Sequence, residues 1–323
     1  MVKRIIAIIL SIMVLSGTLT ALSGCGVEKS DKITVLCTVF PIYDWVRSVV
    51  GDSEKVEVKL LVSGSADLHS YQPTVNDVIA VRGADLTVRV GGMDDSFVGE
   101  LLKNGGCGQD LRLMEIDGIV KREISQGSHE EEHDHHHEHD HEHTVDEHIW
   151  LSLKNAAVSV NAVCEALSRL SPADSEQFRK NADAYIERLS ALDGKYLDAV
   201  SKAPSDKLIF ADRFPFVYMT EDYGIEYEAA FKGCSTEADA SFDTVIRLAD
   251  RLDGWALSYV CVTESSDREL AECVIRASES KKADIIAFDS MQSVSESDIA
   301  SGATYLGIAE SNLETLKIAL STE

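Results

Sequence analysis

Histidine is the residue whose distribution in this chain points most directly to chemistry. The segment SHEEEHDHHHEHDHEH at residues 128–143 holds eight of the ten histidines among seven carboxylates. Neutral imidazoles bind divalent metals, and carboxylates keep cations close. Because the segment has no apolar periodicity and no thiolate, we expect it to collect several ions weakly in many arrangements. A solvated linker with incidental metal affinity is the alternative. The histidines are His129, His133, His135, His136, His137, His139, His141 and His143.

Two histidines lie outside this segment, His69 in GSADLHSYQPT and His148 in VDEHIWLSL. His69 follows the strand-like run KVEVKLLV, and His148 follows the histidine-rich segment. Both are therefore expected on loops near strand ends, where an imidazole can face a cleft and bind a metal. A lone histidine is more often structural, so position alone does not decide between the two roles.

Composition limits the kinds of partner. The 323 residues carry a formal net charge of −25 at pH 7, with 45% hydrophobic residues. Such a charge repels nucleic acid and anionic lipid headgroups and attracts cations, so we expect no nucleic-acid role. The length and apolar content suffice for two ordinary domains with their own cores.

Strand and helix patterns alternate along most of the chain, which predicts parallel sheets in an α/β fold. We expect two similar α/β lobes, residues 32–171 and 204–323, joined by a long helix at 172–203. Apolar residues on one face of that helix are Phe178, Ala182, Tyr185, Leu189, Leu192, Tyr196 and Val200. The expected strands are 32–40, 55–62, 86–90, 111–117, 207–211, 225–231, 257–264 and 283–289. The expected helices are 41–51, 74–85, 95–104, 153–170, 214–224, 241–252, 268–280 and 312–322.

The first 24 residues follow the pattern of an export signal, with Lys3 and Arg4 before an apolar run. The sequence LSGC ends at Cys25 and resembles the lipobox of bacterial lipoproteins. We expect residues 1–24 to be removed, Cys25 to carry lipid, and residues 25–31 to form a tether. A membrane-spanning anchor is the alternative. This interpretation places the protein outside the cytoplasm, anchored to the cell membrane by lipid. Most of the other cysteines are expected to serve packing.

Several segments resemble the zinc and manganese ABC-transporter solute-binding lipoproteins (cluster A-I), particularly the zinc-type members with a His-rich loop. SGSADLHSYQPTVNDV is similar to the signature around that family's first histidine ligand, and DEHIWLSLKNA to the motif around the second. In DEHIWLSLKNA, Glu147 replaces the family's proline. CTVFPIYDWV, ADIIAFDSM and the terminal YLGIAESNLETLKIAL also match, so the resemblance covers essentially everything after Cys25.

The resemblance implies a metal site in the cleft between the lobes, with His69, His148 and Asp289 as ligands. The family's third ligand, a histidine or glutamate after the first strand of the second lobe, corresponds to Ala211 in IFADRF. Alanine cannot ligate, which leaves an open position that zinc tolerates with water. Asp212 is a substitute candidate, although it could instead cap a helix or support a ligand; Glu237 is a weaker one.

The resemblance also implies a function: capture of a divalent transition metal, zinc above manganese or another ion, and delivery to an ABC permease and its ATPase. We expect a monomer that is not an enzyme. One alternative is a surface metal buffer or adhesin that uses the His-rich loop. The other is a zinc hydrolase, since two histidines, a carboxylate and an open position could activate water. No His-Glu-x-x-His, Gly-x-Ser-x-Gly or phosphate-loop pattern supports an enzyme.

Overall fold

The computed structural model describes residues 32–62, 71–106, 108–124, 145–231, 233 and 240–321. Contacts divide the chain into Met1–Lys32 and the compact unit Ile33–Glu323, which contains every helix and strand considered below. None of the helices in the described part combines the length and apolar composition needed to cross a bilayer.

The first lobe is built on a parallel four-stranded sheet in the order β2-β1-β3-β4. The two central strands are largely buried, as strands covered by helices on both faces must be. The chain moves from β1 to one neighbour, β2, and then crosses to the other, β3, so a crevice is expected at the carboxyl ends of these strands. The elements are β1 (Ile33–Cys37), α2 (Phe40–Val50), β2 (Val56–Leu60), α3 (Val75–Gly83), β3 (Leu86–Arg89), α4 (Ser96–Lys103) and β4 (Gln109–Arg112).

The second lobe repeats this plan with a parallel sheet in the order β6-β5-β7-β8. Its inner face carries the ring cluster of Phe210, Phe214, Phe216 and Phe288, and its other face carries a separate apolar cluster that includes Ala211. The predicted pair of similar α/β lobes is therefore confirmed. The elements are β5 (Lys207–Phe210), α7 (Val217–Tyr223), β6 (Glu226–Ala229), α8 (Phe242–Gly254), β7 (Tyr259–Thr263), α9 (Glu269–Ala277) and β8 (Asp284–Phe288).

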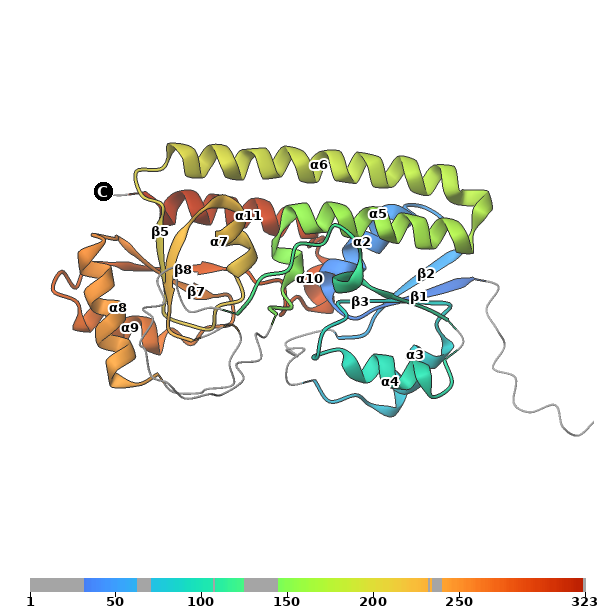
Figure 1. Cartoon of the computed structure of the whole chain (residues 1–323), viewed down its shortest axis with the longest axis horizontal. Helices are drawn as coiled ribbons and strands as arrows, with labels where there is room; N and C mark the ends of the chain where they lie inside the picture. Colours follow the sequence, from blue (N-terminus) through green and yellow to red (C-terminus); the bar gives the residue numbers. More distant parts are fainter. Residues whose placement is uncertain are drawn as a thin grey trace, which may run out of the picture. The chain divides into compact units, whose positions relative to one another are not determined.

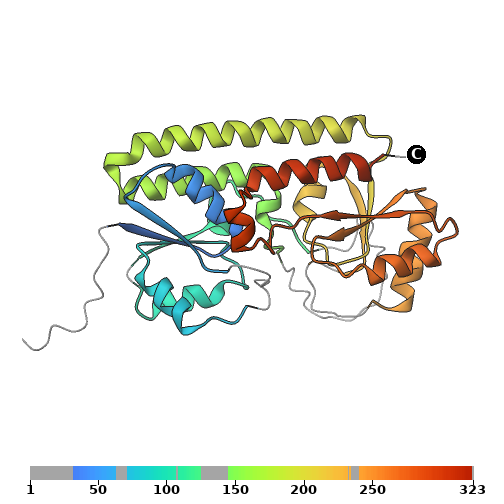
Figure 2. The same cartoon turned by 180° about the vertical axis from the view of Figure 1, so that it is seen from behind.

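A single long helix, α6 (Ser175–Lys202), runs along one side of both lobes, at the top of both views (Figures 1 and 2). It packs on α2 and α5 (Leu153–Leu170) of the first lobe and on α7 and α11 (Tyr305–Ala319) of the second. With 28 residues it is about 42 Å long at ~1.5 Å per residue. Its buried side chains are Phe178, Ala182, Tyr185, Leu189, Leu192 and Tyr196, all from the face predicted by the apolar periodicity.

The structure departs from the predicted elements most clearly in three places. The strand expected at 111–117 ends at Arg112, and the short 3-10 helix η2 (Leu113–Glu115) follows, which buries Leu113 and Met114 without a strand partner. Helix α11 begins at Tyr305, before the predicted start at residue 312, and Thr304 caps it. The short helix α10 (Glu296–Ala300), closed by a Ser295/Asp298 capping box, was not predicted.

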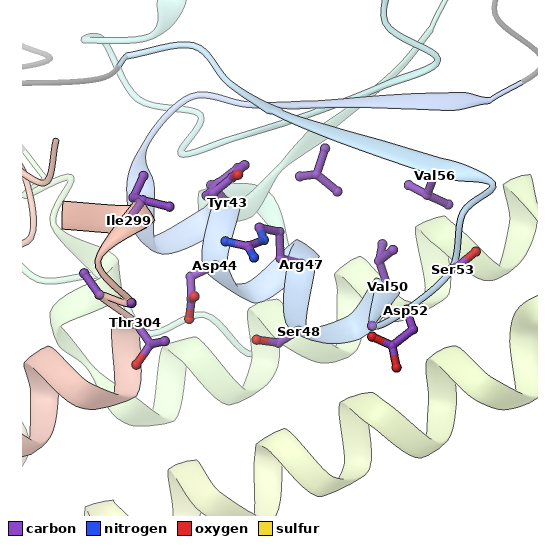
Figure 3. A pocket seen from close by; sticks show the side chains of 14 residues that line it. Tyr43, Asp44, Arg47, Ser48, Val50, Asp52, Ser53, Val56, Ile299 and Thr304 are labelled. Atoms are coloured by element: carbon purple, nitrogen blue, oxygen red, sulfur yellow. The ribbon is translucent and has the colours of Figure 1, made fainter. Parts of the chain in front are cut away.

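The two lobes meet in a junction around Tyr305, at the start of α11. The Tyr305 backbone N–H donates to Asp44 Oδ2 of α2 at 3.1 Å, and the Tyr185 hydroxyl of α6 donates to the same oxygen at 3.1 Å. The Tyr305 ring meets Trp45 edge-on at a centroid distance of 5.2 Å. A groove of about 510 Å³ opens beside this junction, and its lining includes Arg47 of α2 and Thr304 (Figure 3).

The junction predicts an unusual pH dependence at Asp44. Burial raises the pKa of this carboxyl, and the hydrogen bonds from Tyr305 and Tyr185 only partly oppose the rise. A raised folded-state pKa stabilises the protein below the ordinary value of about 3.9, and this contribution is lost as pH rises through the folded-state pKa. Asparagine does not titrate, so Asp44→Asn does not undergo the loss that the wild type shows. The free energy of unfolding of the variant, relative to that of the wild type, should therefore increase as pH rises from about 4. Urea unfolding at several pH values would measure it. A pH-independent difference would contradict the assignment.

Candidate metal centre

His148 is held in a buried position immediately before the 3-10 helix η3 (Ile149–Leu151), between the two lobes. Its residue exposure is 2%, and its Nδ1 lies 2.8 Å from Asp146 Oδ1. The His148 backbone N–H donates to the same carboxylate oxygen at 2.8 Å. Asp146 therefore fixes both the main chain and the ring of His148.

This arrangement favours one tautomer of the imidazole. When Nδ1–H of a neutral ring donates to Asp146 Oδ1, the lone pair lies on Nε2. Histidines that bind metals usually donate their other ring nitrogen to a carboxylate or carbonyl in this way, which raises the basicity of the ligating nitrogen. His148 thus has the chemistry of a metal ligand and also that of an oriented core histidine.

Asp146 is in turn fixed by a residue of the second lobe. The Tyr218 hydroxyl of α7 donates to the Asp146 carbonyl at 2.7 Å and accepts from the Arg122 backbone N–H at 3.2 Å. Burial raises the pKa of the Tyr218 phenol, so the hydroxyl keeps its proton. Glu123 and Val145 form an antiparallel bridge beside these contacts. The two described segments that flank residues 125–144 are therefore tied to each other and to α7.

Trp150 connects the His148 segment to the loop after β8. Its ring packs edge-on against His148 with centroids 5.1 Å apart, and its Nε1–H donates to the Ser290 carbonyl at 2.9 Å. Ser290 is the residue after Asp289. The structure thus brings two of the sequence-predicted ligands, His148 and Asp289, to adjoining segments of opposite lobes.

Asp289 is half-buried and tightly positioned. The Asp289 backbone N–H donates to the Asn312 side chain at 2.9 Å, and the Asp289 carbonyl accepts from that side chain at 2.8 Å. Asp289 Oδ1 accepts from the Met291 N–H at 2.7 Å. Burial, with the negative charges of Glu264 and Asp298, raises the pKa of Asp289 to about 6, against the opposing Met291 hydrogen bond. A bound cation would relieve this repulsion, which suits the carboxylate to metal binding.

Glu264, which the sequence analysis did not single out, supports the same loop. Its two carboxylate oxygens accept from the Ser290 backbone N–H and hydroxyl, each at 2.9 Å. The available signal was positional, because Glu264 directly follows β7 at the carboxyl edge of the sheet where ligands collect.

Glu147 fastens the His148 segment to the first lobe. Its carboxylate accepts from the backbone N–H groups of Met93 and Asp94, in the loop between β3 and α4. Burial and the Asp94 charge raise its pKa to about 7. A Cβ at Gly92 would lie 2.0 Å from Glu147 Cδ, so the contact requires glycine there. The proline that the family carries at this position could not accept these bonds.

The Asp212 carboxylate binds groups of the second lobe and not the His148 segment. Its Oδ2 accepts from the backbone N–H and hydroxyl of Thr263, at 3.0 and 2.7 Å, and its Oδ1 accepts from the Arg213 N–H. It thereby joins the ends of β5 and β7 beside a cavity of about 620 Å³. Ala211 is 2% exposed and packs in the apolar cluster on the outer face of this sheet.

Other predicted site residues lie outside the described part of the chain. These are Cys25, His69, Glu237 and the histidines of residues 128–143. Within the described ranges, no three His, Cys, Asp or Glu side chains converge in a way that could hold a metal ion. The ligand set His69, His148 and Asp289 therefore stays a prediction.

Comparison with known proteins decides the family. The sequence-family model described as zinc-uptake complex component A, periplasmic (ZnuA), matches residues 35–319 of this chain. This chain belongs to the ZnuA family. The resemblance read from the sequence motifs is thereby confirmed, and the family description names a component of a transport complex, not an enzyme class.

Two relatives show how far the ZnuA likeness extends. The zinc-binding lipoprotein AdcA of Streptococcus pneumoniae is 29% identical over 298 residues, which cover 92% of this chain and 58% of AdcA. The high-affinity zinc uptake system protein ZnuA of Bacillus subtilis is 28% identical over 299 residues, covering 92% of this chain and 90% of that protein. The chain thus spans somewhat over half the length of AdcA and most of the length of the Bacillus protein.

Solved structures agree with the ZnuA assignment. The crystal structure of Zn(II)-bound AdcA from Streptococcus pneumoniae has a TM-score of 0.70 at 25% identity, covering 90% of this chain and 58% of that one. The metal-dependent lipoprotein YcdH from Bacillus subtilis has a TM-score of 0.73 at 22% identity, with 90% and 99% covered. The second likeness shows the shared fold alone.

Proposed function

We propose that this protein is an extracytoplasmic receptor that captures zinc between its two lobes and delivers it to the permease and ATPase of an ABC importer. The observation that carries the proposal is the buried His148–Asp146 pair, set in a chain that matches the ZnuA family over residues 35–319. AdcA and the Bacillus ZnuA are both named as zinc-binding or zinc-uptake proteins, which supports zinc as the cargo.

The proposed ligands are His69, His148 and Asp289. Two imidazole nitrogens and a carboxylate oxygen form a donor set that zinc accepts, with water in a fourth position. The opposed placement of His148 and Asp289, joined through Trp150 and Ser290, supports a site between the lobes. Asp212 would have to give up its bonds to Thr263 in order to ligate, so we assign it the task of holding the β5 and β7 ends together.

The histidine-rich segment is proposed to collect the ion before it reaches this site. Val145, which pairs with Glu123, is the first described residue after the segment and lies three positions before His148. Ions held weakly by residues 128–143 would therefore be concentrated near a proposed ligand. We further propose that Cys25 carries the lipid anchor, a role supported by the name of the lipoprotein AdcA, and that the protein works as a monomer.

Zinc titration tests the division of labour between the cleft and the segment. A soluble chain from residue 26 that lacks residues 129–143 should bind one equivalent of zinc tightly, because the proposed ligands lie outside the deletion. The chain that retains the segment should show the same tight equivalent and additional weaker ones. Calorimetry with a competing chelator separates the two classes, and manganese titrated in parallel reports selectivity. Loss of all tight binding in the deleted chain would contradict the proposal.

A further inference from the structure

Tyr218 lies in the second lobe, yet its hydroxyl bonds main-chain groups of the segments that come from the first. Its side chain is fully buried, and the hydroxyl bridges Arg122 N and the Asp146 carbonyl. The neighbouring residue Asp222 of α7 binds the same segments: its Oδ2 accepts from the Ser152 hydroxyl at 2.5 Å, and its Oδ1 pairs with Arg122 at 3.4 Å. One face of α7 therefore binds both chain segments near His148, one at Arg122 and the other at Asp146 and Ser152.

The path from Tyr218 to the imidazole is short. The hydroxyl holds the Asp146 carbonyl, and the Asp146 carboxylate holds both the N–H and the Nδ1 of His148. We propose that Tyr218 is a positioning residue that makes the metal affinity of His148 depend on the contact between the lobes. This inference rests on the proposed function, because it takes His148 to be a zinc ligand.

The arrangement offers a route to metal release in a protein whose back is spanned by a single helix. A small displacement of α7 relative to the first lobe would lengthen the bond from the Tyr218 hydroxyl to the Asp146 carbonyl. Asp146 would then hold the imidazole less firmly, and zinc would dissociate faster. Lobe displacement by a docked permease would thus be converted into lower affinity through one hydroxyl.

The test compares two conservative substitutions in the same helix. Tyr218→Phe removes only the hydroxyl that holds Asp146. Tyr223→Phe is the matched control, because its hydroxyl donates to Asp193 of α6 at 3.0 Å and has no bond to the His148 segment. The intact chain in detergent is titrated with zinc against nitrilotriacetate, which keeps weak sites empty, and zinc dissociation is followed with a chromogenic chelator.

We expect Tyr218→Phe to weaken tight zinc binding about 10-fold and to raise the dissociation rate correspondingly, at the lower end of the 10- to 100-fold range for residues that orient a ligand. Tyr223→Phe should keep wild-type zinc binding even if both variants melt at lower temperature. Equal zinc affinities of Tyr218→Phe and the wild type, or equal weakening by Tyr223→Phe, would overturn this inference but leave the proposed function intact. A wild-type chain with no tight zinc equivalent would overturn the proposed function and the inference with it.

Discussion

Replacing His148 with alanine is expected to lower zinc affinity by at least about 100-fold in the chain that lacks residues 129–143. The substitution removes one of two proposed nitrogen ligands, and even the loss of a group that only orients a ligand costs about 10- to 100-fold. Asp146→Asn should fall between this variant and the wild type, because Asn keeps the size of the side chain but not its charge. Competition titration with a chromogenic chelator would measure both.

The ranking of the variants is the informative outcome. The order wild type, Asp146→Asn, His148→Ala assigns ligation to the imidazole and orientation to the carboxylate. Unchanged affinity in His148→Ala would remove His148 from the site and leave the buried pair with a purely structural role. Circular dichroism of each variant provides the control for folding, since His148 is 2% exposed and its loss leaves a cavity.

Replacing Tyr305 with alanine is expected to lower the free energy of unfolding by about 3–5 kcal/mol, the usual cost of deleting a large buried aromatic side chain. Tyr305 is 1% exposed, packs against Trp45, and donates its hydroxyl to the Trp150 carbonyl at 2.6 Å. Its loss opens a cavity where α2, α11 and the His148 segment meet. Urea unfolding followed by tryptophan fluorescence and circular dichroism would measure the change.

Tyr305→Phe separates the two parts of this effect. It keeps the ring against Trp45 and leaves the buried Trp150 carbonyl without that donor, which should cost about 1–3 kcal/mol. A loss below about 1 kcal/mol in Tyr305→Ala would show that the junction does not bear on stability. The backbone bond from Tyr305 to Asp44 survives in both variants, so neither result depends on it.

Most of the fold was predictable because apolar periodicity is a local property. The run KLIFA and the helical face of Phe178 and Tyr185 each reveal their element within a few residues. The strand expected at 111–117 was wrong beyond Arg112, because a short apolar run is buried equally well by a 3-10 turn. The start of α11 was placed at residue 312 instead of Tyr305, whose ring packs against Trp45 of α2.

The candidate site was predictable only where a residue carries its own chemical signal. His148 and Asp289 stood out by residue type, strand-end position and family resemblance. Glu147, Tyr218 and Glu264 did not, because their roles come from contacts with backbone groups of distant segments. The sequence left two roles open for Asp212, metal ligation and structural support. Its bonds to Thr263 favour the supporting role.

The bond between Asp44 and Tyr305 also bears on the order in which the molecule forms. Each sheet is made from a continuous stretch of chain, so both lobes can collapse through relatively local contacts. The junction cannot, because its two sides are separated by 261 residues. Closing so long a loop is entropically costly and slow, so we expect the lobes to form first and the junction last. Until that step, the Asp44 carboxylate and the Trp45 ring would lack their contacts with Tyr305.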